Sequence, residues 1–543
     1  MADAKRTRVV ILGGGFGGIR AALEFGRIAR RAPDLEVHLV SEENYCVFQP
    51  LLAEVVAGGI EPAHIVNPIR QLCAGCEFHC ATVQSIDLER RTVTMAGADA
   101  RRVLVLPWDH LVLALGQVVD LSRIPGMVEH SFPIKTLGDA FHLRNHVLMR
   151  LEQAELEPDE GVRRRLLTFV TVGAGFSGVE TAAEVHDMIR AVLPYYPVAS
   201  RTGHRMILVH SRDRILNELD AGLSEFAQKE LTARGVEILF NLRTQEATAE
   251  GVRLSDDRFL PAGTVVCTVG NAPLPLILHS GLPQEGGRVL VDETLRVKGR
   301  DDVWAVGDVA RVPDRRRGGS CPPTAQYAVR QGRQCARNVL AAVRGGAPAP
   351  FEFGGLGQLA VVGRRCGVAQ VFGLKISGLV AWMLWRSVYW SKLPGFLCKL
   401  RVGLDWLIDL FFPRDITMFE VRRTEQLRVA HFRAGDTIIQ QGEIGDRFYV
   451  IQRGQVEIVR EEPGLPPRRI AEKGAGESFG EVALLKETPR TATVRCLTAV
   501  DVLTFGRADF RRLVESYGVV RAQMERDLQS HAPAATAPAT PES

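Results

Sequence analysis

The chain has 543 residues, which is enough for about three domains of ordinary size. Hydrophobic residues make up 46% and charged residues 24%, the balance of a globular protein, and a net charge of +4 does not indicate a nucleic-acid partner. The 10 cysteines lack the spacing of a disulfide framework, and no run of about 18 uncharged apolar residues predicts a membrane-spanning helix.

The first predicted strand, residues 9–12, runs directly into a G-x-G-x-x-G loop and then into a predicted helix. Because this strand begins by Arg8, we expect no signal peptide before it. In such a loop the first glycine allows a tight turn, the second lets the backbone approach a pyrophosphate, and the third lets helix and strand pack closely. The phosphates then lie at the positive end of the helix. The loop residues assigned to this first dinucleotide site are Gly13, Gly15, Phe16, Gly17 and Gly18.

The next predicted strand, residues 35–40, ends where an acidic side chain usually binds the ribose hydroxyls of the dinucleotide. Ser41 stands at that place and Glu42 follows it, so Glu42 is either a ribose contact or a solvated loop charge. A further strand within residues 108–116 ends at Gly116, which we expect to lie against the cofactor.

A second copy of the pattern spans roughly residues 166–275, after a helix predicted at residues 138–156 from its apolar period. Its strand, residues 169–172, leads into a second glycine loop and a second helix. Two copies far apart in one chain predict two dinucleotide sites, and therefore an α/β fold with two Rossmann-type domains. The loop residues assigned to the second site are Gly173, Gly175, Phe176, Ser177 and Gly178.

The sequence leaves the nucleotide preference of the second site open. Its second strand, residues 206–209, has no acid directly at its end, where recognition of the NAD ribose usually requires one. Arg212 and Arg214 either meet a 2′-phosphate or remain exposed loop cations, so NADH and NADPH both stay candidates. A later strand ends in Gly270, which is assigned to the same site.

Two segments after residue 300 bear on the first site. Residues 302–310 predict a strand that delivers Gly307 and Asp308 to a helix, where Asp308 can accept from a ribityl hydroxyl and backbone amides face a pyrophosphate. Another helix is predicted to open near Pro322 and to run to about residue 344.

These pieces resemble those of the type II NADH dehydrogenases (NADH:quinone oxidoreductases), flavoproteins of the two-dinucleotide-domain disulfide reductase superfamily. The resemblance covers about residues 7–415 and rests on both glycine loops and on residues 48–52, 173–180, 305–308 and 325–332. It implies FAD at Gly13, Gly15, Gly18 and Asp308, with Ala325 also at the cofactor, and a nicotinamide nucleotide at Gly173, Gly175 and Gly178. It also implies that Glu180 lies beside the nicotinamide and the flavin, and that Gln326 and Gln331 face the quinone.

The resemblance implies an enzyme in which hydride passes from NADH to FAD and two electrons then pass to a membrane quinone. The redox C-x-x-x-x-C of disulfide reductases is absent after the first helix, so electrons should leave the flavin directly. One alternative is a sulfide:quinone-type reductase, for which Cys267 and Cys321 are the only plausible cysteine pair. Another is a cyclic-nucleotide sensor whose flavoprotein part is an idle scaffold. Cys73 and Cys76 have C-x-x-C spacing without a second pair, so we interpret them as buried thiols and predict no metal site.

Residues 372–412 fit an enzyme that attaches to lipid. They contain tryptophans among leucines and recurrent cations, a composition typical of helices at a membrane interface. The alternatives are a dimerisation surface or a buried helix pair. We therefore expect a cytoplasmic protein, peripheral on the inner face of the cell membrane, and leave a homodimer open. The four tryptophans of the segment are Trp382, Trp385, Trp390 and Trp406.

Beyond Pro413 short alternating strands replace the α/β rhythm and indicate a β-sandwich or jelly roll. Residues 421–515 are similar to cyclic nucleotide-binding domains, and this resemblance implies a phosphate-binding cassette. Its helix presents amides to the cyclic phosphate, Arg490 supplies a charged fork and Glu481 accepts from the ribose 2′-OH. Thr491 can donate to a guanine edge, so cAMP and cGMP both stay candidates, and a ligand-free domain is the alternative. The cassette residues are Gly480, Glu481, Val482, Ala483, Arg490 and Thr491.

The predicted organisation is an oxidoreductase over residues 1–420, a cyclic nucleotide-binding domain over 421–515, and a closing helix with a disordered tail over 516–543. Within the first part, FAD-binding residues 1–120 and 280–345 flank a nicotinamide-nucleotide domain at about 160–275, and the membrane segment 372–412 follows. The cyclic nucleotide is expected to regulate the oxidoreductase.

Overall fold

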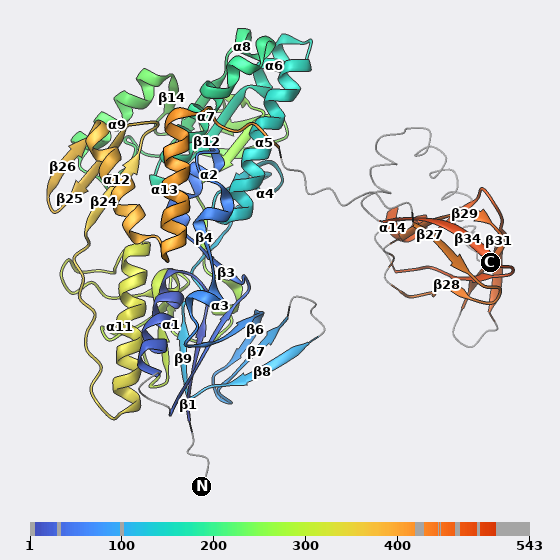
Figure 1. Cartoon of the computed structure of the whole chain (residues 1–543), viewed down its shortest axis with the longest axis horizontal. Coiled ribbons are helices and arrows are strands. Elements are labelled where there is room, and N and C mark those ends of the chain that lie inside the picture. The colour runs from blue at the N-terminus through green and yellow to red at the C-terminus, as the bar shows by residue number, and fades with distance from the viewer. Residues whose placement is uncertain are drawn as a thin grey trace, which may run out of the picture. The chain divides into compact units, whose positions relative to one another are not determined.

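The computed structural model describes residues 6–29, 34–97, 102–418, 428–443, 445, 447–461, 467–485 and 489–506. The chain forms two compact units, Met1–Phe419 and Glu420–Ser543 (Figure 1). The closing helix and tail predicted near the C-terminus lie outside the described residues.

The first unit contains a five-stranded parallel sheet in the order β22-β9-β1-β2-β5. Helices α1 (Phe16–Ala29) and α11 (Ala325–Val343) lie side by side against it (Figure 1). A Cβ at Gly332 would lie 2.2 Å from the carbonyl oxygen of Gly17, so only glycine permits this close approach of the two helices. The strands of the sheet are β1 (Thr7–Leu12), β2 (Leu35–Ser41), β5 (Glu77–Cys80), β9 (His110–Leu113) and β22 (Val303–Ala305).

A second five-stranded parallel sheet, in the order β11-β18-β12-β13-β14, repeats this arrangement behind the second glycine loop. The helix expected at residues 138–156 is confirmed as α5. A capping box between Thr136 and Asp139 fixes its N-terminal end. The predicted α/β architecture is likewise confirmed. The strands are β11 (Phe132–Pro133), β12 (Thr168–Val172), β13 (Arg205–Val209), β14 (Val236–Leu239) and β18 (Thr264–Cys267), and the main helices are α5 (Leu137–Leu156), α7 (Phe176–Val192) and α9 (Ala221–Arg234).

The first unit also contains smaller sheets, among them two antiparallel three-stranded sheets, the second of which leads into a pair of helices. Among the described residues, no helix combines the length and the apolar character that crossing a membrane requires. The first small sheet is β6 (Thr82–Asp87), β7 (Thr92–Ala96) and β8 (Val103–Pro107). The second is β24 (Gly357–Val361), β25 (Gly367–Val371) and β26 (Leu374–Ser377), and it leads into α12 (Gly378–Lys392) and α13 (Phe396–Phe411).

Three local expectations differ from the structure. The segment expected to be helical from residue 372 begins with strand β26 instead. No helix follows β22, because Gly307 adopts a positive φ of 73° and the chain makes only a 3₁₀ turn, η4 (Gly307–Val309), before strand β23 (Ala310–Arg311). The tryptophans of α12 and α13 mostly face inward: Trp382, Trp385 and Trp406 are at most 8% exposed.

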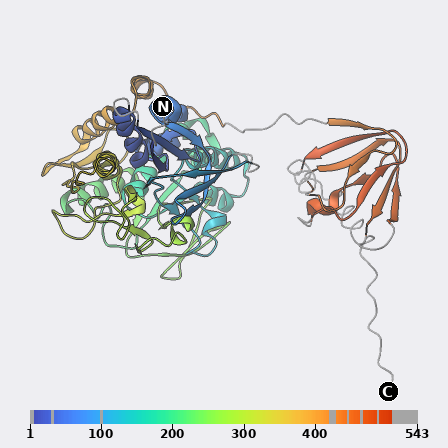
Figure 2. The same ribbon diagram turned by 90° about the horizontal axis from the view of Figure 1, so that it is seen from below.

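In its described residues the second unit has two antiparallel four-stranded sheets, in the orders β27-β34-β29-β32 and β28-β33-β30-β31 (Figure 2). The short antiparallel strands predicted from the alternation of residues are therefore confirmed. Gly435 and Gly454 take φ values near +90° between strands, as turn glycines do. The elements are β27 (Arg428–Phe432), β28 (Thr437–Ile439), β29 (Arg447–Arg453), β30 (Val456–Arg460), β31 (Arg468–Lys473), β32 (Ser478–Phe479), α14 (Glu481–Leu485), β33 (Thr493–Cys496) and β34 (Val500–Gly506).

Candidate functional site

The first glycine loop forms a cradle between β1 and α1. Gly13 has a φ of +110°, and a Cβ there would lie 2.4 Å from the carbonyl oxygen of Ala114. A Cβ at Gly18 would lie 1.9 Å from the carbonyl oxygen of Gly13, so only glycine fits at this position in the first turn of α1. A Cβ at Gly15 would instead meet nothing within 4 Å. The space beside Gly15 is where a pyrophosphate fits, so the cradle suits a dinucleotide.

The second loop has the same geometry. Gly173 has a φ of +104°, and a Cβ at Gly178 would lie 1.8 Å from the carbonyl oxygen of Gly173. A Cβ at Gly175 would meet nothing within 4 Å. The chain therefore contains two matched cradles, each with one open glycine.

The remaining sequence-predicted cofactor residues differ in their surroundings. Gly116 has a positive φ of 71° and open space beside it, whereas a Cβ at Gly270 would lie 2.4 Å from the carbonyl oxygen of Asp120. Position 270 thus requires glycine because any side chain there would collide with the backbone of Asp120. Glu42 is exposed and Asp308 is half-buried in the η4 turn.

A cavity of about 300 Å³ lies between the two cradles and is lined by side chains of α1 and α7, the helices that follow the two glycine loops, among others. Five sequence-predicted residues reach it, from the N-terminal ends of three helices. They are Phe16 of α1, Phe176, Ser177 and Glu180 of α7, and Ala325 of α11. Lys135 and Tyr389 of α12 also line the cavity, although no local pattern in the sequence marks either of them.

Glu180 is a titratable group on the wall of this cavity. Its Oε1 accepts hydrogen bonds from the Val361 backbone N–H at 3.1 Å and from the Trp385 indole Nε1–H at 3.3 Å. Burial nevertheless raises the pKa of Glu180 to about 8, because the carboxylate loses its hydration. The side chain is therefore a neutral carboxylic acid at pH 7.

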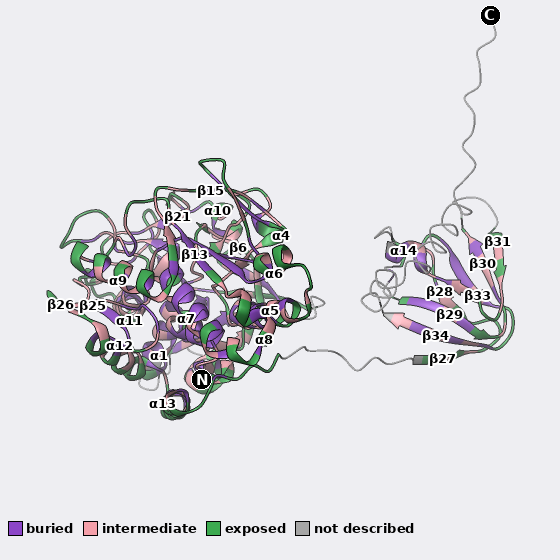
Figure 3. Cartoon of the chain, turned by 90° about the horizontal axis from the view of Figure 1, so that it is seen from above, coloured by how far each residue is buried: buried purple, intermediate pink, exposed green. Residues whose placement is uncertain are grey.

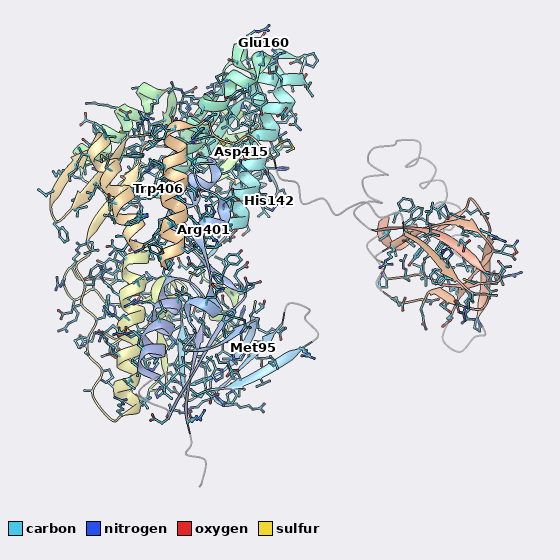
Figure 4. All side chains as sticks on the ribbon, in the orientation of Figure 1. Met95, His142, Glu160, Arg401, Trp406 and Asp415 are labelled. Carbon is cyan, nitrogen blue, oxygen red and sulfur yellow. The ribbon has the colours of Figure 1, made fainter. Side chains whose placement is uncertain are left out.

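Behind Glu180 a buried network of four acidic and two basic side chains connects α7 to α12 and α13. Arg414 bonds Glu184 at 3.1 Å and Asp409 at 3.3 Å. Arg386 lies 3.6 Å from Glu54, which also accepts from Trp406 Nε1 at 2.5 Å. Figure 4 labels Trp406 on α13. Burial raises the pKa of Glu184 to about 7, and two guanidinium groups are too few to balance Glu54, Glu180, Glu184 and Asp409 when all are ionised.

The two predicted glutamines of α11 do not line the cavity. The Gln331 side chain is 2% exposed, and its Oε1 accepts from the Gly307 backbone N–H at 2.8 Å. The Gln326 amide donates to the Gly357 carbonyl at 3.2 Å and accepts from the Leu356 N–H at 3.0 Å. Positions five apart on a helix point about 140° from each other, so the two cannot share one face. Arg330, one turn beyond Gln326, lies 4.0 Å from the centre of the Phe353 ring.

A second, largely apolar cavity of about 280 Å³ lies where α1 and α11 meet the turn between α12 and α13. Phe16 lines both cavities, which makes it the wall between them. Other lining residues are Ile19, Leu23, Val47, Phe48, Leu72, Val329 and Pro394, with Arg20 and Lys392 as the cations.

Helices α12 and α13 carry exposed residues on one side (Figure 3), and many of these are large apolar side chains. On α13 these follow the three- and four-residue spacing of one helical face. The residues of α13 are Leu397, Leu400, Leu404, Leu407, Ile408 and Phe411, each between 47% and 76% exposed. Together with Leu379, Val380 and Met383 of α12 they form what we call the exposed apolar face. Lys399 and Arg401 lie on the same helix. This arrangement, rather than the tryptophans, is the amphipathic feature of the segment.

The cysteines offer no thiolate nucleophile near the cradles. Cys267 and Cys321 are both buried, and burial raises the pKa of the Cys321 thiol to about 11. Burial likewise raises the pKa values of Cys73 and Cys76 to about 12; Cys73 is buried as interpreted, whereas Cys76 is half-buried.

In the second unit a cavity of about 220 Å³ is lined by all six predicted cassette residues. Arg490 is 6% exposed, and its guanidinium donates to the carbonyl oxygens of Gly480 at 2.9 Å and Arg447 at 2.7 Å. Glu481 is 7% exposed, and its buried Oε2 has no hydrogen-bond partner in the described part of the chain. A buried carboxylate oxygen without a donor is costly, and a hydroxyl that donated to it would remove that cost.

Comparison with known proteins gives matches to three families. Residues 7–332 match the pyridine nucleotide-disulphide oxidoreductase family, residues 356–415 the NDH2 C-terminal domain, and residues 429–517 the cyclic nucleotide-binding domain. Demethylphylloquinone reductase NdbB of Synechocystis sp. is 32% identical over 421 residues, which span 75% of this chain and 97% of that protein. Type II NADH:quinone oxidoreductase NdhA of Mycobacterium tuberculosis is 30% identical over 422 residues, spanning 74% and 87%.

Among solved structures, NDH2 from Plasmodium falciparum in complex with NADH superposes with a TM-score of 0.71 at 18% identity, covering 76% of this chain and all of that one. A sulfide:quinone oxidoreductase from Aquifex aeolicus gives a TM-score of 0.57 at 16% identity. The fold alone therefore does not separate the two enzymatic alternatives, but the sequence relatives do. The chain belongs to the type II NADH:quinone oxidoreductases of the pyridine nucleotide-disulphide oxidoreductase family, and it carries a cyclic nucleotide-binding domain behind them.

Proposed function

We propose that the first cradle holds FAD, that the second holds NADH, and that the cavity between them is where the nicotinamide meets the flavin. The open spaces beside Gly15 and Gly175 support this assignment, because each leaves room for a pyrophosphate at a helix N-terminus. When bound, FAD supplies acceptance of a hydride and transfer of two electrons. The chain's own residues bind and orient the two nucleotides, exclude water with Phe16 and Phe176, and hold a proton on Glu180.

The proposed chemistry is tested by mixing the full-length enzyme with NADH and a short-chain quinone. Yellow protein that NADH bleaches and quinone recolours supports the assignment, whereas colour that NADH leaves unchanged contradicts it. A parallel assay with NADPH decides the preference. We expect NADH to be favoured, because the family resemblance is long and the two loop arginines, Arg212 and Arg214, are a weak signal for a 2′-phosphate.

Glu180 should give the enzyme a pH dependence. Since burial raises the pKa of Glu180 to about 8, the acid is protonated below that pH and ionises above it. An ionised carboxylate would place negative charge in the cavity that must accept a hydride, so kcat/KM for NADH should fall as the pH rises through about 8.

The Glu180→Gln variant keeps the acceptor for Val361 and Trp385 but cannot ionise. Its pH profile should be flat from pH 6 to about pH 9, while the exposed-site control Glu225→Gln should keep the wild-type break. A break that survives in Glu180→Gln assigns the titration to another group and overturns the prediction.

We further propose that the exposed apolar face rests on a lipid surface and that quinone reaches the flavin through the second cavity. Lys392 and Pro394 line this cavity and belong to the end of α12 and the turn that joins it to α13. An apolar face with cations beside it is the arrangement of interfacial helices. The localisation on the inner face of the cell membrane rests on the same proposal.

Charging the exposed apolar face should detach the enzyme from vesicles. Leu400 and Leu407 are 47% and 53% exposed, so Leu400→Glu/Leu407→Glu removes apolar contact without opening the core. Co-sedimentation with anionic liposomes should fall at least about tenfold, while reduction of a soluble dye is unchanged. Leu156→Glu on α5, 85% exposed, is the control and should bind like the wild type. Equal binding of all three proteins would place the lipid contact elsewhere.

For the second unit we propose binding of cAMP or cGMP. Arg490 would contact the cyclic phosphate, the first amides of α14 would add to it, and the buried Oε2 of Glu481 would accept from the ribose 2′-OH. Thr491 leaves the choice between adenine and guanine open. Regulation requires in addition that the bound nucleotide favours one state of the enzyme over another.

Removing the Arg490 charge should weaken nucleotide binding strongly. Arg490→Gln in the full-length protein loses a charge-assisted contact, so the Kd for cAMP or cGMP should rise about 10- to 100-fold. Arg433→Gln, an exposed arginine that does not line the cavity, is the control. Calorimetry measures both, and NADH oxidation with and without nucleotide measures regulation. Equal affinity of Arg490→Gln and wild type would remove Arg490 from the site.

A further inference from the structure

We propose that a divalent transition-metal ion, best matched by Zn²⁺, binds at the edge of the first parallel sheet through His38, Glu77 and His79. Among the described residues, these form the one group of three or more metal-ligating side chains whose ligand atoms all lie within 4.8 Å of one another. None of them belongs to a cradle, to either of the two cavities described above or to the buried network.

The sheet register brings the three side chains together. In the parallel pairing of β2 with β5, His38 lies opposite Glu77 and Val40 lies opposite His79. Side chains two apart on a strand point to the same face, so His79 projects on the same side as Glu77, next to His38. Because β5 is an edge strand in this sheet, the group is accessible from one side: His38 is 3% exposed, whereas Glu77 is 62% exposed.

The distances suit a tripod of ligands. His38 Nδ1 and His79 Nε2 lie 2.9 Å apart, and Glu77 oxygens lie 3.6 Å from the first nitrogen and 3.7 Å from the second. Ligand atoms bound tetrahedrally to zinc at ordinary bond lengths are about 3.3 Å apart, so small side-chain rotations convert the group into three corners of a tetrahedron. Water would fill the fourth corner on the exposed side.

A second set of contacts fixes His38 in the tautomer that a metal ligand needs, with its proton on Nε2. His38 Nε2 lies 2.9 Å from Glu36 Oε1, so its proton is held there and Nδ1 is left with a lone pair toward the group. Glu36 is itself held by Arg8, whose Nε and Nη2 donate to Oε2 at 3.2 Å and 3.1 Å. A carboxylate behind a ligating histidine is the usual support of a protein metal site.

In the metal-free protein one proton lies between the two imidazoles. With His38 donating through Nε2, the contact between His38 Nδ1 and His79 Nε2 is a hydrogen bond donated by His79. A metal ion would take the place of that proton: neutral His79 would carry its single N–H on Nδ1 and present Nε2 to the ion, with no net release of protons. The ion would join the edge strand β5 to β2 and stabilise the sheet.

The test is equilibrium dialysis of the full-length protein, freed of metal by a chelator, against Zn²⁺, followed by elemental analysis. We expect about one equivalent bound with micromolar or tighter affinity, and no comparable binding of Mg²⁺, which prefers oxygen ligands. His79→Ala should weaken binding at least about 100-fold, and Glu36→Gln about 10- to 100-fold. His130→Ala, an exposed histidine on α4 (Met127–His130), should bind like wild type.

A second readout separates this site from adventitious binding by thiols. Zn²⁺ should raise the unfolding temperature of wild type and of His130→Ala by several degrees, and should leave His79→Ala unchanged. Equal zinc occupancy of wild type and His79→Ala, or no zinc bound to wild type at about 100 µM, overturns the proposal. Should His79→Ala fold poorly, Glu77→Gln, at a 62% exposed side chain, provides the same comparison.

Discussion

Protein carrying Gly15→Val should purify without flavin colour, whereas protein carrying Gly175→Val should be yellow but unable to be bleached by NADH. A Cβ at either glycine meets nothing within 4 Å, so the folded chain accommodates valine at both positions. The branched side chain would instead fill the space that each pyrophosphate needs. Each substitution therefore blocks one cradle and leaves the other intact.

The measurements are the flavin absorbance per mole of protein and the rate of its loss on mixing with NADH. We expect less than about a tenth of the wild-type flavin in Gly15→Val, and wild-type flavin with bleaching slowed at least about 100-fold in Gly175→Val. Gly138→Val, at an exposed glycine in the first turn of α5 where the nearest contact is 3.6 Å, is the control. Yellow, active Gly15→Val protein would contradict the flavin assignment.

Removing Arg414 should destabilise the first unit far more than removing an exposed arginine. Arg414 bonds Glu184 at 3.1 Å and Asp409 at 3.3 Å, with all three side chains at most 6% exposed. Arg414→Met leaves two buried carboxylates without their cation, so the free energy of unfolding should fall by about 3–5 kcal/mol. The exposed pair of Arg164 with Glu160, the latter labelled in Figure 4, is the control, and Arg164→Met should change the free energy of unfolding by no more than about 1 kcal/mol.

The stability lost in Arg414→Met should increase as the pH rises. Burial already raises the pKa of Glu184 to about 7, and removal of Arg414 raises it further, so the folded variant binds protons that the unfolded chain releases. Its stability is therefore present at low pH and is lost as the pH rises, and the deficit should be larger at pH 8 than at pH 6. Thermal unfolding, followed by flavin fluorescence, measures the stability of wild type and variant at each pH. Arg414→Met/Glu184→Gln should recover part of the loss, and a variant as stable as wild type at pH 8 would show that the network carries no net energy.

The sequence predicts those features that depend on neighbouring residues. Each glycine loop follows its strand directly, so the turn at Gly13 and the close packing at Gly18 can be inferred from spacing alone. The helix α5 could be predicted for the same reason, since its capping box and its apolar period lie within one segment.

The remainder of the site comes from segments far apart in the chain. Trp385 donates to Glu180 although the two residues are 205 positions apart in the chain, and no local sequence pattern predicts such a pair. Tyr389 reaches the central cavity from the same distant helix. Gln331 is a different case, because a spacing of five on a helix already separates it from Gln326 by about 140°. Composition likewise indicates an amphipathic segment but not which side chains face outward: three of the four tryptophans are buried, whereas most of the leucines of α13 are exposed.

The position of Arg414 also has a consequence for how such a fused protein can evolve. Arg414 is buried among the acids of the catalytic unit, whereas residues 415–418 after it are all exposed. The last buried residue described in the oxidoreductase is thus Arg414, several residues before the second unit begins. A boundary of this kind tolerates the loss, exchange or lengthening of whatever is attached behind it, because a recombination event there cuts through no core. A sensory module could therefore be acquired by this enzyme without a compensating change in its interior.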